Sequence, residues 1–304
     1  MSGKGVDLGA SVTARLLNQA KERGDDYQIV LSDYCFERFL YRLGVSAMRQ
    51  RFVLKGAMLL RVWSDHPYRA TRDLDLLRRG DGSSEAIAQD IRSIVETDVE
   101  DDGVRFAPTE LQIEPIRAEA EYVGARVVLP ARCGTARLML QIDVGLGDSV
   151  WPLPRTCAYP MLLDSPAPSV LAYPREAVVA EKLEAMIVLG DRNSRIKDFF
   201  DLYYLASTFE FDRATLAESV RRSFTRRGTN VPADEPVGLT QSYWNNPVRP
   251  AQMRAFLRRS RLQGSHGFDE AFLAVLRAFL LPVLDDLRTE QARAASWLPG
   301  KGWS

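Results

Sequence analysis

Long apolar runs are missing from this sequence of 304 residues, and histidine and cysteine, on which several classes of site depend, are scarce. No run approaches the about 18 residues that cross a bilayer, so we expect no membrane partner. The histidines, His66 and His266, are too few to support histidine-based catalysis. Three widely spaced cysteines argue against a disulfide framework or a zinc site. The first residues lack the apolar core of a signal peptide, so we expect a cytoplasmic protein.

Net charge is also absent, because 40 basic residues balance 40 acidic ones, but the charge is unevenly spread. Residues 96–102 are acidic, whereas residues 213–261 contain ten arginines against three acids. A basic segment in a neutral chain is either a nucleic-acid footprint or a solvated helical face. The first alternative would place RNA along the paired arginines, with Tyr243 or Trp244 stacking on bases. These arginines are Arg221, Arg222, Arg226, Arg227, Arg258 and Arg259.

The short run from Arg72 to Leu77 is typical of a β-strand that ends in the turn residues 78–82. Side chains alternate along a strand, so Asp73 and Asp75 point to one face, and the leucines between them point to a core. Two carboxylates that repel each other favour a divalent cation as their neutraliser. Upstream, residues 52–63 pass from strand to helix at Gly56, where backbone amides can approach a phosphate. A solvated edge strand is the alternative.

Asp143 is the third carboxylate of the predicted site, on a strand over residues 136–146. If that strand neighbours the Asp73 and Asp75 strand, three acids converge around one or two Mg²⁺ or Mn²⁺ ions. Such a set supports phosphoryl or nucleotidyl transfer, in which the third acid helps to deprotonate the attacking hydroxyl. The alternative is an aspartate that caps a turn.

Two predicted helices carry further candidates. Lys182 lies on or beside the apolar stripe of a helix over residues 175–189, where a lysine either snorkels to water or meets an anion such as a triphosphate. Asp198 and Asp201 lie on an aromatic helix over residues 195–207, and either complete a site or form an internal ion pair with Lys182 or Arg195.

The remaining pattern predicts a first domain, residues 1–150, and a mainly helical second domain, residues 151–304. Helices are expected at 11–23 and 32–44, with Ser11 and Ser32 as N-caps, and at 85–96. Strands are expected at 110–116 and 122–129. The proline-rich residues 147–174 are predicted to connect the domains. Further helices are expected at 212–224, 249–259 and 268–289, with an irregular loop at 231–250 and a frayed tail after Arg293.

The pieces in this order resemble the AbiEii/AbiGii toxin family of nucleotidyltransferases, which includes MenT-type toxins of toxin–antitoxin systems. The resemblance spans roughly residues 50–206 and rests on the segments 52–56, 71–76, 181–185 and 195–202. It implies an α+β fold with a DNA polymerase β-like nucleotidyltransferase core, a mixed sheet with helices, followed by a helical C-terminal region.

The resemblance also implies the roles of individual residues. Asp73 and Asp75 would hold the metal, to which the strand reasoning above adds Asp143, and Lys182 with Asp198 or Asp201 would complete the catalytic set. The nucleoside triphosphate would be bound by residues near these acids, namely Lys55, Gly56, Ala57, Thr71, Lys182, Arg195 and Lys197. The acceptor would be RNA, at the tRNA 3′ end, so that translation is blocked, and a cognate antitoxin protein would neutralise the enzyme.

One position departs from the family pattern, because the Gly-Ser pair of the superfamily reads Gly56-Ala57 here. Backbone amides, Thr71 or Ser64 would then replace the serine hydroxyl at a phosphate. Two alternatives to RNA modification remain open. One keeps the chemistry but transfers the nucleotide to a protein or small-molecule hydroxyl, and the other is a non-catalytic regulator that binds nucleoside triphosphates.

Overall fold

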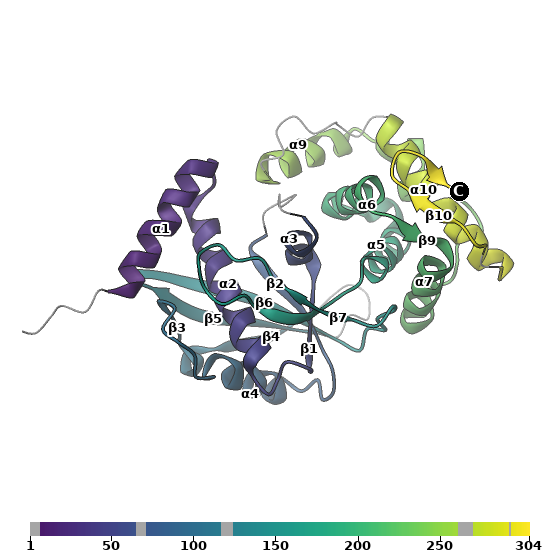
Figure 1. Cartoon of the computed structure of the whole chain (residues 1–304). Coiled ribbons are helices and arrows are strands. Elements are labelled where there is room, and N and C mark those ends of the chain that lie inside the picture. Colours follow the sequence, from purple (N-terminus) through teal and green to yellow (C-terminus); the bar gives the residue numbers. More distant parts are fainter. Residues whose placement is uncertain (1–6, 65–70, 117–123, 261–269, 292) are drawn as a thin grey trace, which may run out of the picture. The chain divides into compact units, whose positions relative to one another are not determined.

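The computed structural model describes residues 7–64, 71–116, 124–260, 270–291 and 293–304 (Figure 1). The chain forms two compact units. The first contains residues 1–147 and 155–172, and the second contains residues 148–154 and 173–304. The start of the strand predicted over residues 122–129 lies outside the described residues.

A mixed sheet forms the centre of the first unit, with eight strands among the described residues. The main strand order is β3-β5-β6-β2-β1-β8-β7, and β4 also pairs with β5. The β2–β6 and β1–β8 pairs are parallel, and the other pairs are antiparallel. The strands are β1 (Phe52–Lys55), β2 (Asp73–Arg78), β3 (Val104–Phe106), β4 (Gln112–Pro115), β5 (Gly124–Cys133), β6 (Ala136–Leu146), β7 (Arg155–Ala158) and β8 (Ser169–Ala172).

Four α-helices of the first unit are described: α1 (Leu8–Arg23), α2 (Tyr27–Val45), α3 (Leu59–Trp63) and α4 (Ser84–Val95). Helix α2 packs against α1 and α4 and against strands β6 and β8. The predicted N-caps Ser11 and Ser32 are wrong. The N-caps are Asp7 and Asp26, whose carboxylates accept hydrogen bonds from backbone N–H groups in the first turns of α1 and α2. Short 3₁₀ turns lie at Gly56–Met58 and Pro108–Glu110.

The proline-rich residues 147–174 are more than the predicted connection, because they contribute β7 and β8 to the first sheet. Strand β8 runs parallel to β1, with Val53 opposite Leu171, and β7 closes that edge. The prolines lie outside both strands, where no backbone N–H is needed for the ladder.

The second unit is mainly helical, and its helices among the described residues are α5 (Arg175–Leu189), α6 (Ile196–Thr208), α7 (Arg213–Arg227), α8 (Gln241–Trp244), α9 (Val248–Ser260) and α10 (Glu270–Thr289). Further 3₁₀ turns occupy Gly190–Arg192 and Val237–Leu239, so the predicted irregular loop at 231–250 contains both a 3₁₀ turn and α8. Phe199, Leu202 and Leu205 of α6 are fully buried in its core.

The predicted fraying after Arg293 is wrong. Strands β10 (Ser296–Leu298) and β11 (Gly302–Trp303) form a small antiparallel sheet with β9 (Phe211–Asp212). Trp297 is 3% exposed, and its indole N–H donates to the Ala206 carbonyl. The Trp303 ring stacks on Phe279 of α10, so the two tryptophans attach the tail to the helical core.

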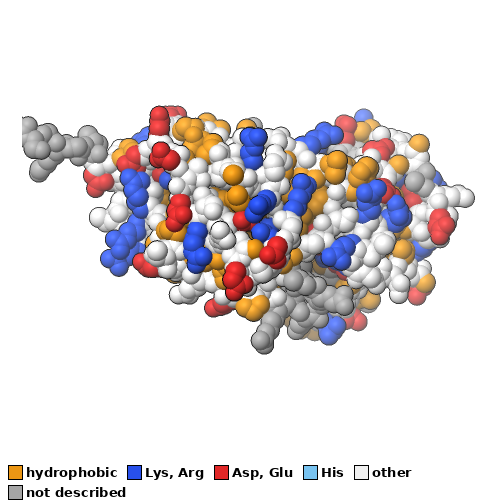
Figure 2. All heavy atoms as spheres, turned by 90° about the horizontal axis from the view of Figure 1, so that it is seen from below, with side chains coloured by type: hydrophobic (Ala, Val, Ile, Leu, Met, Phe, Trp, Pro, Cys, Tyr) orange, Lys and Arg blue, Asp and Glu red, His pale blue; other side chains and the backbone are white. Residues whose placement is uncertain are grey.

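The predicted α+β class is therefore confirmed, with a mixed sheet in the first unit and helices in the second. Among the described residues, no helix has both the length and the apolar character needed to cross a membrane. Acidic and basic side chains are interspersed on the face of the molecule that Figure 2 displays.

Candidate functional site

One candidate site is the exposed face of β2 in the first unit. Leu74 and Leu76 are completely buried, whereas Asp73 and Asp75 are half-buried on the opposite face. The alternation predicted for this strand is confirmed. Strand β6 runs parallel to β2 with Asp143 directly opposite Asp75. Because paired positions point to the same side of a sheet, the three carboxylates share one face.

Gly56 lies against this face for a steric reason. Strand β1 is antiparallel to β2, with Lys55 opposite Asp75, so the next residue passes beside the Asp75 side chain. Gly56 has φ = 71°, and a Cβ at this position would lie 1.9 Å from the Asp75 Oδ2 atom. Only glycine meets both demands, the left-handed backbone and the close approach of the carboxylate.

Asp143 is held by an arginine that the sequence reasoning did not single out. The Arg126 Nε and Nη2 atoms donate to the two Asp143 carboxylate oxygens over 2.9 and 2.8 Å. Hydrogen bonding to Asp143 raises the pKa of Arg126 above its ordinary value. Arg126 is the residue opposite Asp143 on β5, and Glu114 of β4 follows on its other side. The sequence signal that could have identified Arg126 is the alternation of residues 124–133, which puts Arg126 on the exposed face.

A hard divalent ion suits the donor set of this face, since Mg²⁺ prefers carboxylate oxygens. Asp73 and Asp75 fit such an ion, because they point the same way and Gly56 leaves room at Asp75. Asp143 is adjacent, but Arg126 already neutralises its charge. Within the described parts of the chain, no group of three acids, histidines or cysteines is gathered closely enough to hold a metal by itself.

A second candidate cluster lies in the helical unit. Lys182 of α5 places its Nζ atom 2.7 Å from Asp198 and 2.8 Å from Asp201, both on α6. The carboxylates are 5% and 3% exposed, and the lysine side chain is 15% exposed. Arg195 Nε lies 2.7 Å from the other oxygen of Asp198. The structure therefore shows the internal ion pair that the sequence left open for Asp198 and Asp201, and the anions that Lys182 meets are these two carboxylates.

Burial acts to raise the pKa of Asp198, but the charges of Lys182 and Arg195 outweigh it and hold that pKa below its ordinary value. Asp198 is therefore an ionised carboxylate at neutral pH, and it cannot serve as a proton donor there. Asp198 and Asp201 share the ammonium group of Lys182, which fixes the lysine in place between two helices.

The other predicted nucleotide-binding residues are distributed over both units. Lys55 and Ala57 are buried in the first unit, at 8% and 7% exposure. The Thr71 hydroxyl donates to the Asp73 carboxylate, so it orients that side chain. Arg195 and Lys197 are exposed at the start of α6 in the second unit.

Three of the arginines proposed to bind RNA are occupied by neighbouring acids. Arg221 and Arg222 both bind Glu218 on the same helix, and the Arg222 guanidinium also stacks on Trp151. Arg227 lies 2.8 Å from Glu184 and 3.2 Å from Asp148. Arg226 and Arg258 are exposed, and the Arg259 side chain lies outside the description.

The predicted stacking of bases on Tyr243 is wrong, because its ring is 2% exposed and its hydroxyl donates to the Asn193 carbonyl. The half-buried Trp244 also makes contacts within the second unit. Its ring packs on Phe199 and Phe272, and its indole N–H donates to the Gly238 carbonyl.

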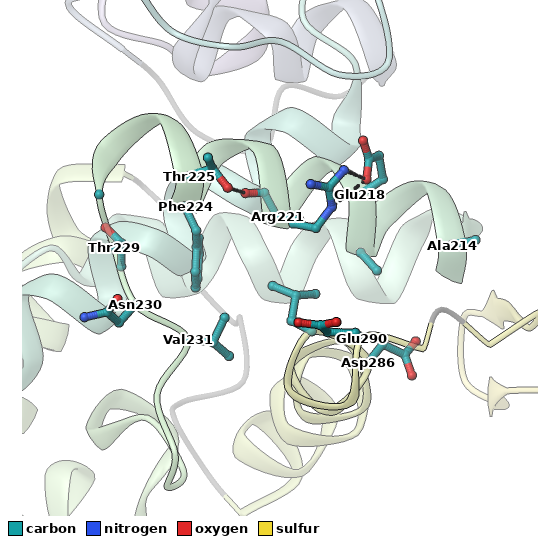
Figure 3. A pocket seen from close by; sticks show the side chains of 13 residues that line it. Ala214, Glu218, Arg221, Phe224, Thr225, Thr229, Asn230, Val231, Asp286 and Glu290 are labelled. Carbon is teal, nitrogen blue, oxygen red and sulfur yellow. Dashed lines mark hydrogen bonds and ion pairs between the residues drawn. The ribbon is translucent and has the colours of Figure 1, made fainter.

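A cavity of about 750 Å³ opens between α7 and α10 in the second unit. Figure 3 shows Phe224 and Val231 on its apolar side, and Glu218 bound to Arg221 at its border. None of the carboxylates or cations predicted for the active site lines this cavity.

A family model described as "Nucleotidyl transferase AbiEii toxin, Type IV TA system" matches residues 38–277. No curated protein matches the chain. A Helicobacter pylori protein assigned as a candidate nucleotidyltransferase is 12% identical, with 88% of this chain and 100% of that chain covered and a TM-score of 0.48. JHP933 from Helicobacter pylori is 13% identical, with 87% and 95% covered and a TM-score of 0.46.

Proposed function

Because the chain belongs to the AbiEii family of nucleotidyltransferase toxins, we propose that it transfers a nucleoside monophosphate from a metal-bound nucleoside triphosphate to an RNA hydroxyl. The family makes the chain an enzyme of the nucleotidyltransferase class and gives it an antitoxin partner. The observation that carries the proposal is the extent of the match, since residues 38–277 include both the β2 aspartates and the Lys182 cluster.

We assign the metal to Asp73 and Asp75, with Thr71 orienting Asp73 and Gly56 making room for Asp75. When bound, Mg²⁺ or Mn²⁺ offsets charge on the triphosphate and orients it for in-line displacement. The acceptor hydroxyl oxygen forms a bond to the α-phosphorus, and the bond to pyrophosphate breaks with its electron pair leaving on pyrophosphate. Asp143 receives the hydroxyl proton, and Arg126 orients Asp143 for this step.

We assign the triphosphate contacts to Lys182, with Asp198 and Asp201 holding its ammonium group in a fixed place. Arg195 and Lys197 supply further positive charge at the start of α6. In the first unit, the Gly56 and Ala57 backbone and Lys55 are the corresponding candidates. The buried Ala57 has no hydroxyl, so backbone amides take the role that a serine has elsewhere in the superfamily.

The toxin class supports an RNA acceptor, with the tRNA 3′ end as the proposed site, because blocking that end stops translation. Incubation of the protein with each labelled nucleoside triphosphate, Mg²⁺ and total RNA, followed by a denaturing gel, tests the proposal. We expect one nucleotide to label small RNA, and the Asp75→Ala variant to leave it unlabelled. Label in protein or in a small molecule would replace RNA by the alternative acceptor, and the absence of any label would contradict the proposal.

A further inference from the structure

A row of arginines crosses one end of the first sheet. Arg105 of β3 is opposite Arg132 of β5, which is opposite Arg137 of β6. All three are exposed. Arg105 binds Asp101 over 2.8 Å, whereas neither Arg132 nor Arg137 forms an ion pair with a described residue. Like charges directly opposite each other destabilise a sheet, so this pair is a structural cost that an anionic ligand would offset.

The same face of the sheet leads from these arginines to the aspartates. The β5–β6 register is unbroken from Cys133 opposite Ala136 to Gly124 opposite Gly145, so every second residue keeps to one side. Beyond the arginines come the pair Pro130 and Met139, and then the pair Val128 and Gln141. Gln141 is the residue opposite Asp73 on β2.

The face between the charged ends is apolar and accessible. Met139 is 62% exposed, and Pro130 and Val128 are half-buried beside it. The alternate residues of both strands, such as Leu129 and Leu140, are buried on the other side. Gln141 lies four positions after Arg137, or about 13 Å along a strand. That distance is a few nucleotides of an RNA strand.

We propose that this face is the track along which the RNA acceptor reaches the aspartates. Its phosphates contact Arg132 and Arg137, and its sugars and bases lie on the surface around Met139. The inference rests on the proposed function for the identity of the acceptor. An acidic protein would also suit two arginines, but it has no need of a continuous face that ends at the metal-binding aspartates, whereas a substrate does.

The test compares an Arg132→Gln/Arg137→Gln double variant with Arg155→Gln, an exposed arginine on the opposite edge strand β7. The first measurement is the affinity for a 5′-fluorescent single-stranded RNA at several salt concentrations. We expect the double variant to bind RNA about tenfold more weakly at moderate salt, with a slope of log affinity against log salt that is shallower by about 1.4. Arg155→Gln and the wild type should agree, and Mg-ATP affinity should be equal in all three.

A charge-preserving variant, Arg132→Lys/Arg137→Lys, should keep the salt slope of the wild type, and thermal unfolding checks that each variant is folded. Unchanged RNA affinity and slope in the glutamine variant would overturn the proposal. A second outcome would also overturn it: polyglutamate binds the wild type but not the glutamine variant, while both proteins bind RNA equally. The face would then serve an acidic protein.

The proposed function and the track fail in different ways. If the wild type labels no RNA but its RNA affinity depends on the two arginines as expected, the track stands and the proposed function falls. If the double variant labels RNA at the wild-type rate when RNA is limiting, the track falls and the proposed function stands.

Discussion

Replacing Gly56 by alanine should both strain the left-handed backbone at this position and push the Asp75 carboxylate out of place. The introduced Cβ would lie 1.9 Å from Asp75 Oδ2, and ordinary contact begins at 3.4 Å, so the carboxylate has to retreat by 3.4 − 1.9 = 1.5 Å. Strand β2 is held between β1 and β6, so the Asp75 side chain has to move rather than its backbone.

The magnitude of the effect follows from two costs. A non-glycine residue in the left-handed region costs roughly 1–2 kcal/mol. Forcing a side chain off its rotamer costs about 0.5–1.5 kcal/mol more. We therefore expect the Gly56→Ala variant to lose about 2–3 kcal/mol of unfolding free energy in urea. A catalytic group displaced by more than 1 Å costs about 100-fold in rate, so nucleotide transfer should fall by at least that factor.

Gly80→Ala is the matched control. Gly80 has φ = 93°, and a Cβ there meets nothing within 4 Å, so this variant carries the backbone strain without any clash. It should lose only the backbone part of the stability, roughly 1–2 kcal/mol, and keep the wild-type transfer rate. Equal transfer rates in Gly56→Ala and Gly80→Ala would refute the assignment of Asp75 to the reaction.

Three further predictions concern charged residues. Asp75→Asn should abolish nucleotide transfer to RNA. Its thermal unfolding midpoint should stay near that of the wild type, because the like-charged Asp73 does not stabilise the half-buried Asp75 carboxylate. Normal transfer would remove the metal-site assignment. Lys182→Met should cost about 3 kcal/mol in urea unfolding, because it removes the ammonium group that the buried Asp198 and Asp201 share, although Arg195 still contacts Asp198. The pKa of Asp198 is lower in the folded state than its ordinary value of 3.8. The ionised Asp198 therefore stabilises the folded protein above pH 3.8, and this contribution is lost as the pH falls through the folded-state pKa. The unfolding free energy of Lys182→Met should depend less on pH in that acid range than that of the wild type. Arg227→Gln should cost about 3 kcal/mol of unfolding free energy, because it removes the cation that contacts the buried Glu184 carboxylate. Replacing its exposed neighbour, Arg226→Gln, should change the unfolding free energy by less than about 0.5 kcal/mol. Equal unfolding midpoints in the two variants would contradict the role of Arg227 at Glu184.

Local patterns were sufficient to predict the β2 strand and the helices of the second unit. The alternation of Asp73, Leu74, Asp75 and Leu76 fixes which residues point to the core, whatever the strand pairs with. The helix over residues 175–189 begins after Pro174 and ends before Gly190, as the sequence predicts. Such signals reside within a few residues of each other, so a single sequence contains them.

Pairing between distant segments could not be predicted in the same way. Arg126 meets Asp143 only because β5 and β6 pair in one register out of several possible. The tail sheet consists of strands of two or three residues, too short for any alternation to appear, and it is held by Trp297 and Trp303. The role of Arg227 is equally non-local, because its helical spacing does not reveal that it contacts Glu184 of α5.

The pairing of strands also explains how the sheet holds two adjacent aspartates. Lys55, Asp75, Asp143 and Arg126 are successive cross-strand neighbours on β1, β2, β6 and β5. The row therefore carries a cation, two anions and a cation, so each aspartate has a positive neighbour on its outer side. The repulsion between the aspartates is offset from both flanks by residues of the sheet itself. The fold itself thus positions these carboxylates, and under the proposed function an ion would bind Asp73 and Asp75 on β2 without rearrangement of the sheet.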